Sequence, residues 1–226
     1  MKSRSKKYKE AVKIVDSNKT YGIEEAISLL KGMPQLKFDQ SVDLAIQLNI
    51  DSKKSDQLLR GTVVLPHGTG KKKKIAVFCR GEAEKEAKES GADFIGGQEL
   101  IDKVNGGWLD FDVAVSTPEM MRDLSKLGKV LGPKGLMPSP KTGTVTNNIA
   151  QAVKELKAGK VEFKTDKQGG IHLAIGKVSF DANKLAENIK TLLAAVKANK
   201  PASIKGNLIN SVSLSTTMSP GFKVAA

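Results

Sequence analysis

The chain has 226 residues and a formal net charge of +13, from 37 lysine and arginine residues against 24 aspartate and glutamate residues. Hydrophobic residues make up 39% of the chain, a fraction too high for global disorder. So large a positive surplus in a small protein favours a polyanionic partner. Nucleic acid is the first candidate and an anionic membrane surface the second, and a generally basic surface without such a partner is the third interpretation.

The single cysteine, Cys79, rules out an internal disulfide and fits no zinc cluster. It ends the apolar segment 74–79, where we expect it to pack as a small apolar residue. The basic first ten residues are not followed by an apolar segment, so they do not resemble a secretory signal. Because no run of about 18 apolar residues occurs, we expect no membrane span and a cytoplasmic location.

Two amphipathic helices are predicted near the N-terminus, over residues 4–16 and 23–30, and Gly32 marks the end of the second. Residues 38–50 then alternate between apolar and polar side chains, which is the pattern of a long strand buried on one face. A further strand is expected over residues 61–65, before a turn that contains proline and glycine.

From about residue 70, short apolar segments alternate with helical ones. The pattern predicts strands over residues 74–79, 94–95 and 111–116, and helices over residues 82–90, 98–104, 118–124 and 148–157. Thr117 is the expected N-cap of the third of these helices, with Pro118 at its first position. Strands that alternate with helices are typical of a parallel sheet with crossover helices.

Residues 128–146 are unusual because glycine, proline and lysine are concentrated there. No regular helix or strand interior fits residues 132–140. Leu131, Leu136 and Met137 are nevertheless too apolar for a flexible linker. A long loop inside a compact domain is usually functional, and the alternative is a packed surface loop with solubilising lysines.

The alternating pattern returns near residue 160. Strands are expected over residues 161–165 and 171–175, joined by a hairpin-like turn at residues 166–170. A long helix is predicted to start after Asp181 and to stop before Pro201. Residues 208–217 then form another half-buried strand, whose polar side consists of Ser211, Ser213, Ser215 and Thr217.

These patterns predict an α/β protein in which one domain is inserted into another. Residues 1–67 and 160–226 form a discontinuous α+β domain, and residues 68–159 form an inserted three-layer α/β, Rossmann-like domain; one continuous α/β domain is the alternative. The two crossings, at Gly68 and Gly159, are predicted to act as a hinge. Residues 1–67 carry a net charge of +4 and residues 160–226 carry +6, against +3 for the insert. We therefore expect the discontinuous domain to hold the main nucleic-acid site.

Catalytic chemistry is sparse in the sequence. His67 and His172 have no nearby cysteine and no second histidine at metal-binding spacing, so each is interpreted as structural or as a polar contact. The segment Gly68-Thr69-Gly70-Lys71 is not a phosphate-binding loop, because a glycine is missing before it and Lys72 replaces the magnesium-binding Ser or Thr. We predict no catalytic residue, metal site or cofactor. A phosphate- or nucleotide-handling enzyme is the alternative function.

The residues that remain suit RNA. The hydroxyls of the last strand can donate to phosphates and pair with ribose 2′-hydroxyls. Phe38 could stack on a base, although its position in the alternation matches the buried side chains. Aromatic residues make up only 4% of the chain, which favours a structured RNA over a single strand read by stacking.

Four segments together resemble one protein family: residues 128–146, Asp110-Phe111-Asp112-Val113, residues 166–172 and Ser215-Thr216-Thr217-Met218. Over nearly its whole length the chain is similar to the bacterial ribosomal proteins of the mobile stalk of the large subunit, beside the tRNA exit site. The resemblance implies two domains, the first built from both termini, and binding to a folded segment of large-subunit ribosomal RNA. It also implies that the protein helps to move and release deacylated tRNA and, as in many members, represses translation of its own messenger.

The resemblance further implies RNA contacts at Lys37, Phe38, Ser41, Lys164, Asp166, Lys167, His172, Ser211, Thr217 and Met218. We expect these residues to cluster at one edge of the discontinuous domain, with Phe38 exposed. The chain departs from the family pattern at Ser41, where threonine is usual, and at Ser219, where glycine is usual. A glycine can allow close approach of the backbone to RNA, so Ser219 puts that local contact in question.

The expected partners are large-subunit ribosomal RNA, exit-site tRNA and the protein's own messenger RNA, with no membrane and no homo-oligomer. The resemblance does not explain residues 128–146, and we hypothesise that this loop braces the insert or faces tRNA.

Overall fold

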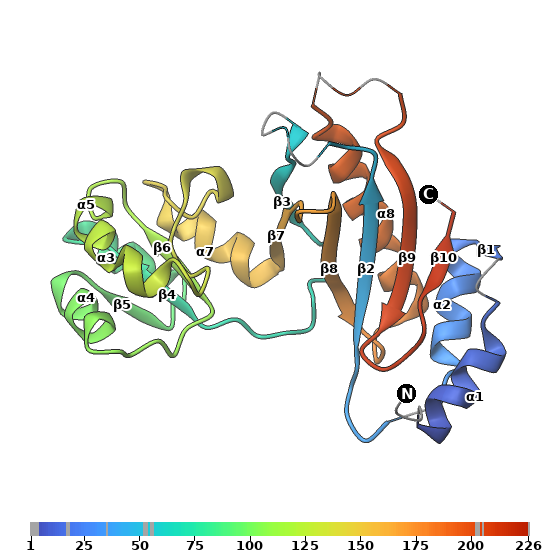
Figure 1. Ribbon diagram of the computed structural model, residues 1–226. Coiled ribbons are helices and arrows are strands. Elements are labelled where there is room, and N and C mark those ends of the chain that lie inside the picture. The colour runs from blue at the N-terminus through green and yellow to red at the C-terminus, as the bar shows by residue number, and fades with distance from the viewer. Residues whose placement is uncertain are drawn as a thin grey trace. The chain divides into compact units, whose positions relative to one another are not determined.

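The computed structural model describes residues 5–16, 19–34, 36–51, 54, 57–201, 204 and 206–225. The chain divides into two compact units. Unit 1 combines Met1–Gly70 with Val161–Ala226, and unit 2 is Lys71–Lys160 (Figure 1). The chain crosses between the units close to Gly68 and Gly159, and both glycines have positive φ angles, of 63° and 110°.

Unit 1 is built around a five-stranded sheet with the strand order β1-β10-β9-β2-β8. Strand β2 (Ser41–Leu48) lies between β8 (Gly170–Lys177), at the edge, and β9 (Ile209–Thr216), and is antiparallel to both. The short strands β10 (Phe222–Val224) and β1 (Thr20–Tyr21) extend the sheet beyond β9. A separate two-stranded sheet pairs β3 (Arg60–Val64) with β7 (Lys160–Lys164).

One face of the five-stranded sheet is covered by helices α2 (Ile23–Lys31) and α8 (Ala182–Ala198) (Figure 1). Alternate residues of β2 enter the core, which the predicted alternation requires. Ile27 and Leu30 of α2 pack into the same core, together with five large apolar side chains of α8. Helix α1 (Lys6–Ile14) adds Ala11 to this core and begins at Ser5, whose hydroxyl accepts a hydrogen bond from Tyr8 N.

The turn at residues 166–170 is present, but the predicted hairpin is wrong. Asp166 N donates to Gly170 O over 2.8 Å, which closes a tight turn. The strands on its two sides belong to different sheets, because β7 pairs with β3 and β8 pairs with β2. The turn residues predicted that β7 and β8 pair with each other. Each strand pairs instead with a strand from the N-terminal part of the chain, β7 with β3 and β8 with β2.

Unit 2 contains a parallel sheet with the order β5-β4-β6, formed by Ile75–Phe78 (β4), Phe94–Gly96 (β5) and Val113–Ser116 (β6). Helices α3 (Glu82–Glu89) and α7 (Ile149–Ala158) contribute to the core on one face. On the other face lie α4 (Gln98–Asn105), α5 (Met121–Leu124) and α6 (Gly128–Leu131). The α/β fold class that the sequence predicted is confirmed.

The predicted N-cap at Thr117 is wrong. Helix α5 begins three residues after Pro118, at Met121, and Met120 is its N-cap. Residues 117–120 form turns instead, in which Met120 N and Met121 N donate to the carbonyls of Thr117 and Pro118. Met120 is buried, so packing of its side chain against the sheet sets where this helix starts.

The loop at residues 128–146 is bound to unit 2 by both apolar contacts and hydrogen bonds. Leu131 is buried, and Leu136 and Met137 pack against the same core. The backbone brackets Ser116 of β6, which donates to Thr144 O and accepts from Thr146 N. Short helical turns stand at both ends, as α6 and a 3₁₀ turn at Pro140–Thr142. These contacts support a bracing role for the loop.

A buried asparagine ties α8 to the start of the first crossing. The side chain of Asn188 is fully buried, and its amide nitrogen donates to Gly68 O (3.0 Å) and to Ile175 O (2.8 Å). Its amide oxygen accepts from His67 N over 3.2 Å, and the His67 ring lies 2.5 Å from the carboxylate of Glu187. Asn188 thus satisfies three backbone groups on β8 and on the turn after β3.

We expect Asn188→Leu, which keeps the approximate volume, to lower the free energy of unfolding by about 2–4 kcal/mol, because several buried backbone groups lose their partner. Asn199→Leu is the matched control: the Asn199 side chain is exposed and donates to Ala195 O, so its loss should cost under about 1 kcal/mol. Urea denaturation followed by circular dichroism measures both. Equal effects of the two substitutions would contradict the role of Asn188.

Candidate nucleic-acid interface

The uncovered face of the unit 1 sheet carries small and polar side chains from three adjacent strands. Residues that are paired across strands point to the same face. The pairing places Ala45 between His172 and Ser213, and Asp43 between Ala174 and Ser215. Gln47 lies between Gly170 and Ser211 in the same way. We call this surface the open face, and its small side chains leave the backbone accessible to a large partner.

At one end of the open face, the start of β2 meets the end of β9. Ser41 N donates to the Thr217 hydroxyl and Thr217 N donates to Ser41 O, both over 3.2 Å. Lys177, at the end of β8, donates to the Ser41 hydroxyl over 3.0 Å. The Gln40 side-chain oxygen accepts from the Thr216 hydroxyl (2.9 Å) and from Met218 N (3.2 Å), which holds the turn after β9 in place.

Two large apolar side chains project into solvent at this end. Phe38 is 52% exposed and Met218 is 57% exposed. Phe38 follows the exposed Lys37 and precedes β2, so the strand alternation does not extend to it. The expectation of an exposed Phe38 is confirmed. The alternation that assigned Phe38 to the buried face begins only at Ser41, the first residue of β2.

At the opposite end of the open face, Asp166 organises a polar turn. Its carboxylate accepts from Gln168 N (2.8 Å) and Gly170 N (2.7 Å), and it lies 3.4 Å from the His172 ring. The two backbone donors, followed by His172, hold the pKa of Asp166 below its ordinary value. Lys164 and Lys167 are exposed beside this turn, and Gln47 joins it to β2 by donating to Gln168 O over 2.9 Å.

The ten predicted contact residues therefore do not form one cluster, and that expectation is wrong. Lys37, Phe38, Ser41, Thr217 and Met218 lie at one end of β2. The other five lie near Gln47, and we call the two sets the Thr217 group and the Asp166 group. Six strand steps separate Ser41 from Gln47, a distance of about 20 Å. The open face connects the two groups.

Ser219 does not occupy a conformation that requires glycine. Among the described residues, only glycines have positive φ angles. The Ser219 hydroxyl accepts from Thr216 N over 2.8 Å and donates to Pro220 O, so the side chain closes the turn after β9. Glycine at this position would lose these two hydrogen bonds.

The middle of the open face was missed as a site by sequence reasoning, although the alternation placed Asp43 and Gln47 on its polar side. Burial raises the pKa of Asp43, and nearby Lys177 opposes that effect. Ala45 and Ala174 carry no polar signal in the sequence, yet their size keeps the face flat. Lys177 also gave no signal, because its contact with Ser41 depends on the pairing of β2 with β8.

Three of the four lysines that follow Gly70 have partners within unit 2. Lys71 lies 3.1 Å from Asp112, Lys74 lies 2.7 Å from Asp110, and Lys73 donates to Lys160 O. These bonds favour a solvated entry to β4 over a phosphate-binding loop. Cys79 is fully buried, and burial raises its pKa to about 11, which agrees with its predicted packing role.

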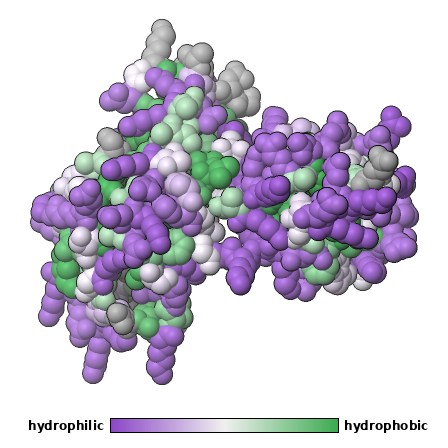
Figure 2. Space-filling model, turned by 180° about the vertical axis from the view of Figure 1, so that it is seen from behind, coloured by the Kyte–Doolittle hydropathy of each residue, from purple (hydrophilic) through white to green (hydrophobic). Residues whose placement is uncertain are grey.

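Metal clusters and membrane-spanning helices are both absent from the described ranges. No group of three or more His, Cys, Asp or Glu side chains within them could hold a metal ion. None of the helices there has both the length and the apolar character that a membrane crossing requires. Seen from behind, hydrophilic side chains dominate the surface, with smaller hydrophobic groups between them (Figure 2).

The fold and the open face define a class: an α/β protein of two units that presents one uncovered, polar sheet face. A family model described as the ribosomal protein L1p/L10e family matches residues 29–220. The chain therefore belongs to this family, and the resemblance read from its sequence is confirmed. As a ribosomal protein it is structural and not an enzyme.

Individual relatives match nearly the full chain. Large ribosomal subunit protein uL1 of Aster yellows witches'-broom phytoplasma is 58% identical over 221 residues, which cover 98% of this chain and 96% of that protein. The protein of the same name from Protochlamydia amoebophila is 56% identical over 220 residues, covering 97% and 93%. That of Kosmotoga olearia is 55% identical over 224 residues, covering 99% and 97%.

The lowered pKa of Asp166 gives the turn at residues 166–170 a defined pH dependence. The carboxylate supports the turn at neutral pH, and this support is lost as the pH falls through the lowered pKa. We expect a carboxyl NMR titration of the folded protein to give a midpoint below 3.8 for Asp166, and the same carboxyl in denaturant to titrate near its ordinary value. A folded midpoint at or above 3.8 would contradict the two backbone hydrogen bonds.

Proposed function

We propose that this chain is a structural constituent of the large ribosomal subunit in the cytoplasm and that it binds ribosomal RNA through the open face of unit 1. We further propose that it assists the movement and release of deacylated tRNA from the exit site, and that it represses translation of its own messenger. The observation that carries the proposal is the open face itself, bounded by the Thr217 group and the Asp166 group, in a family whose members are ribosomal proteins.

The chemistry of the open face supports a folded RNA as the partner. Hydroxyls of Ser211, Ser213 and Ser215 lie in line along β9 and can bond phosphate oxygens or ribose hydroxyls. Two groups about 20 Å apart suit a rigid partner that touches both. Because lysines supply much of the attraction, log affinity should fall linearly with log salt concentration.

The acidic groups of the open face support selectivity for RNA over a generic polyanion. Asp43 lies mid-strand on β2 and Asp166 lies at the end of the face. Carboxylates repel phosphates but accept hydrogen bonds from ribose hydroxyls and base amino groups. A partner that presents such donors at these two places is favoured over one that presents only phosphates.

The contribution of unit 2 to tRNA movement is part of the same proposal. The glycines at the two crossings, Gly68 and Gly159, have φ angles that other residues rarely adopt. We propose that they act as the hinge between an RNA-bound unit 1 and unit 2. The loop at residues 128–146 would then brace unit 2 through its contacts with β6.

Phe38→Ala should weaken binding to large-subunit ribosomal RNA by about 1–3 kcal/mol, because an exposed ring that stacks on a base loses that contact. Thermal stability should stay unchanged, because the ring contributes little to the core. Val64→Ala, which shortens another exposed apolar side chain of unit 1, is the matched control and should bind normally. Equal affinities for wild type and Phe38→Ala in a filter-binding assay would remove Phe38 from the interface.

The Thr217 hydroxyl needs a variant that separates fold from contact, because it also accepts from Ser41 N. Thr217→Ala should cost about 1–3 kcal/mol in RNA affinity, and Thr217→Ser should retain most of it. Loss of binding in both variants would assign the effect to the methyl group instead of the hydroxyl.

If the protein represses its own messenger through the open face, ribosomal RNA should compete with that messenger for binding. Added protein should lower translation of that messenger in a reconstituted system, and added ribosomal RNA should relieve the repression, because both RNAs would occupy the open face. Phe38→Ala should repress less than Val64→Ala. Repression that ribosomal RNA does not relieve would place the messenger elsewhere on the molecule.

A further inference from the structure

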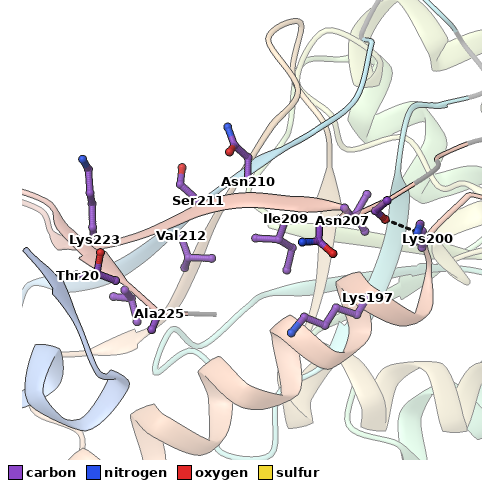
Figure 3. Close-up of a pocket in the computed structure, with 13 residues that line it drawn as sticks. Thr20, Lys197, Lys200, Asn207, Ile209, Asn210, Ser211, Val212, Lys223 and Ala225 are labelled. Atoms are coloured by element: carbon purple, nitrogen blue, oxygen red, sulfur yellow. Dashed lines mark hydrogen bonds between the residues drawn. The ribbon is translucent and has the colours of Figure 1, made fainter.

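A basic hollow of about 530 Å³ lies at the outer end of β9 (Figure 3). It exists because β10 has three residues and β9 has eight, so β10 pairs only with residues 212–214 of β9. The first three residues of β9, Ile209 to Ser211, therefore have no strand on that side among the described residues. Three lysines line the hollow: Lys197 in the last turn of α8, Lys200 just after that helix, and Lys223 on β10.

Lys223 belongs to the same side of the sheet as the open face. It pairs with Ser213 on β9 and with Thr20 on β1, so one row crosses all five strands from His172 to Thr20. Figure 3 shows Lys223 and Ser211 pointing to one side of the sheet and Val212 to the other. Ser211 lines the hollow and also belongs to the Asp166 group, so the two surfaces are continuous.

The charge in the hollow is not neutralised locally. No aspartate or glutamate lines it within the part of the chain that the structure describes. Elsewhere six lysines pair with acids among the described residues, as Lys71 does with Asp112. Lys200 donates to Gly206 O over 2.6 Å, and no salt bridge involves Lys197 or Lys223 within the described ranges. Concave surfaces lined by one sign of charge concentrate the field that attracts an anion.

We propose that the sugar–phosphate backbone of the RNA bound to the open face continues across β9 and turns into this hollow past residues 209–211, which β10 leaves unpaired. Phosphates are neutralised there by Lys223 on the open-face side and by Lys197 on the side of the sheet that α8 covers. Asn210, Ser211 and Thr20 supply uncharged hydrogen-bonding groups along the same path. This inference rests on the proposed RNA-binding function and extends its footprint by two strands. It assigns roles to Lys197, Lys223, Asn210 and Thr20, which no sequence motif indicated.

Two other interpretations of the hollow are weaker. Lysines at the C-terminal end of a helix offset its dipole, which accounts for Lys197 in the last turn of α8 and for Lys200 just after it, but not for Lys223 on a strand. An open strand edge can take up a peptide strand, but three free residues offer a short ladder, and the lysines disfavour pairing at an edge. A phosphate backbone fits both the charge and the continuity with the open face.

The first test measures affinity and its salt dependence for the full chain on large-subunit ribosomal RNA. The double variant Lys197→Gln, Lys223→Gln should bind about tenfold more weakly near 0.1 M salt, and the slope of log affinity against log salt should shrink by about 2. The control double variant Lys13→Gln, Lys190→Gln removes the same charge from exposed helical positions of unit 1 and should leave the slope close to wild type.

The second test locates the RNA directly. Cys79 is buried with a raised pKa, so a cysteine-directed iron chelate should react selectively with an added surface cysteine. Tethered to Lys223→Cys, the chelate should cut bound RNA at a few discrete nucleotides, and tethered to Lys190→Cys it should not.

The outcomes separate this inference from the proposed function. Loss of RNA binding in Phe38→Ala, together with an unchanged slope in the Lys197, Lys223 variant and no cutting from position 223, overturns the inference and leaves the function standing. No binding of ribosomal RNA by the wild-type chain overturns both. If a peptide protected position 223 from modification while the RNA stayed bound, the RNA could not occupy the hollow. That result would assign the hollow to a protein partner and also overturn the inference.

Discussion

One-sided burial of the five-stranded sheet is the constraint on which unit 1 depends. Helices α2 and α8 cover one face and draw every second residue of β2, β8 and β9 into the core. Each strand is thereby locked in register, because a slip of one residue would exchange apolar and polar side chains between the faces. The opposite face is left uncovered and holds the small and polar side chains that we propose for RNA binding. Fold and candidate site thus follow from the same alternation.

The position of β2 between β8 and β9 explains why the site has two ends. β2 pairs with β8 on one side and β9 on the other, so each of its ends collects a turn from a different part of the chain. The Thr217 group depends on hydrogen bonds between Ser41 and Thr217, and the Asp166 group depends on a carboxylate that caps its own turn. Neither end requires the other for its local geometry, and the rigid sheet sets the distance between them.

The sheet of unit 2 differs from that of unit 1, because it is parallel and buried on both faces. Its strands carry continuous apolar segments instead of an alternation, as β4 shows with four buried residues in a row. The loop at residues 128–146 completes one of these faces with Leu131 and bonds to the edge of β6. Its glycines and prolines prevent regular structure, and its apolar residues keep it attached.

The sequence by itself determined the α/β class, the longer helices and strands, and the chemical character of the polar strand faces, because periods of two and of about 3.6 residues are local properties of the chain. The short elements β1, α6 and β10 were not predicted. It also carried the resemblance to a ribosomal family. Only the tertiary structure decided that β7 and β8 join different sheets, that α5 starts after Thr117, and that the predicted contact residues divide into two groups. Strand partners and packing contacts such as that of Met120 lie far apart in the sequence, and no local pattern specifies them. For the same reason Lys177 and Lys223 became visible as parts of a surface only when the sheet was assembled.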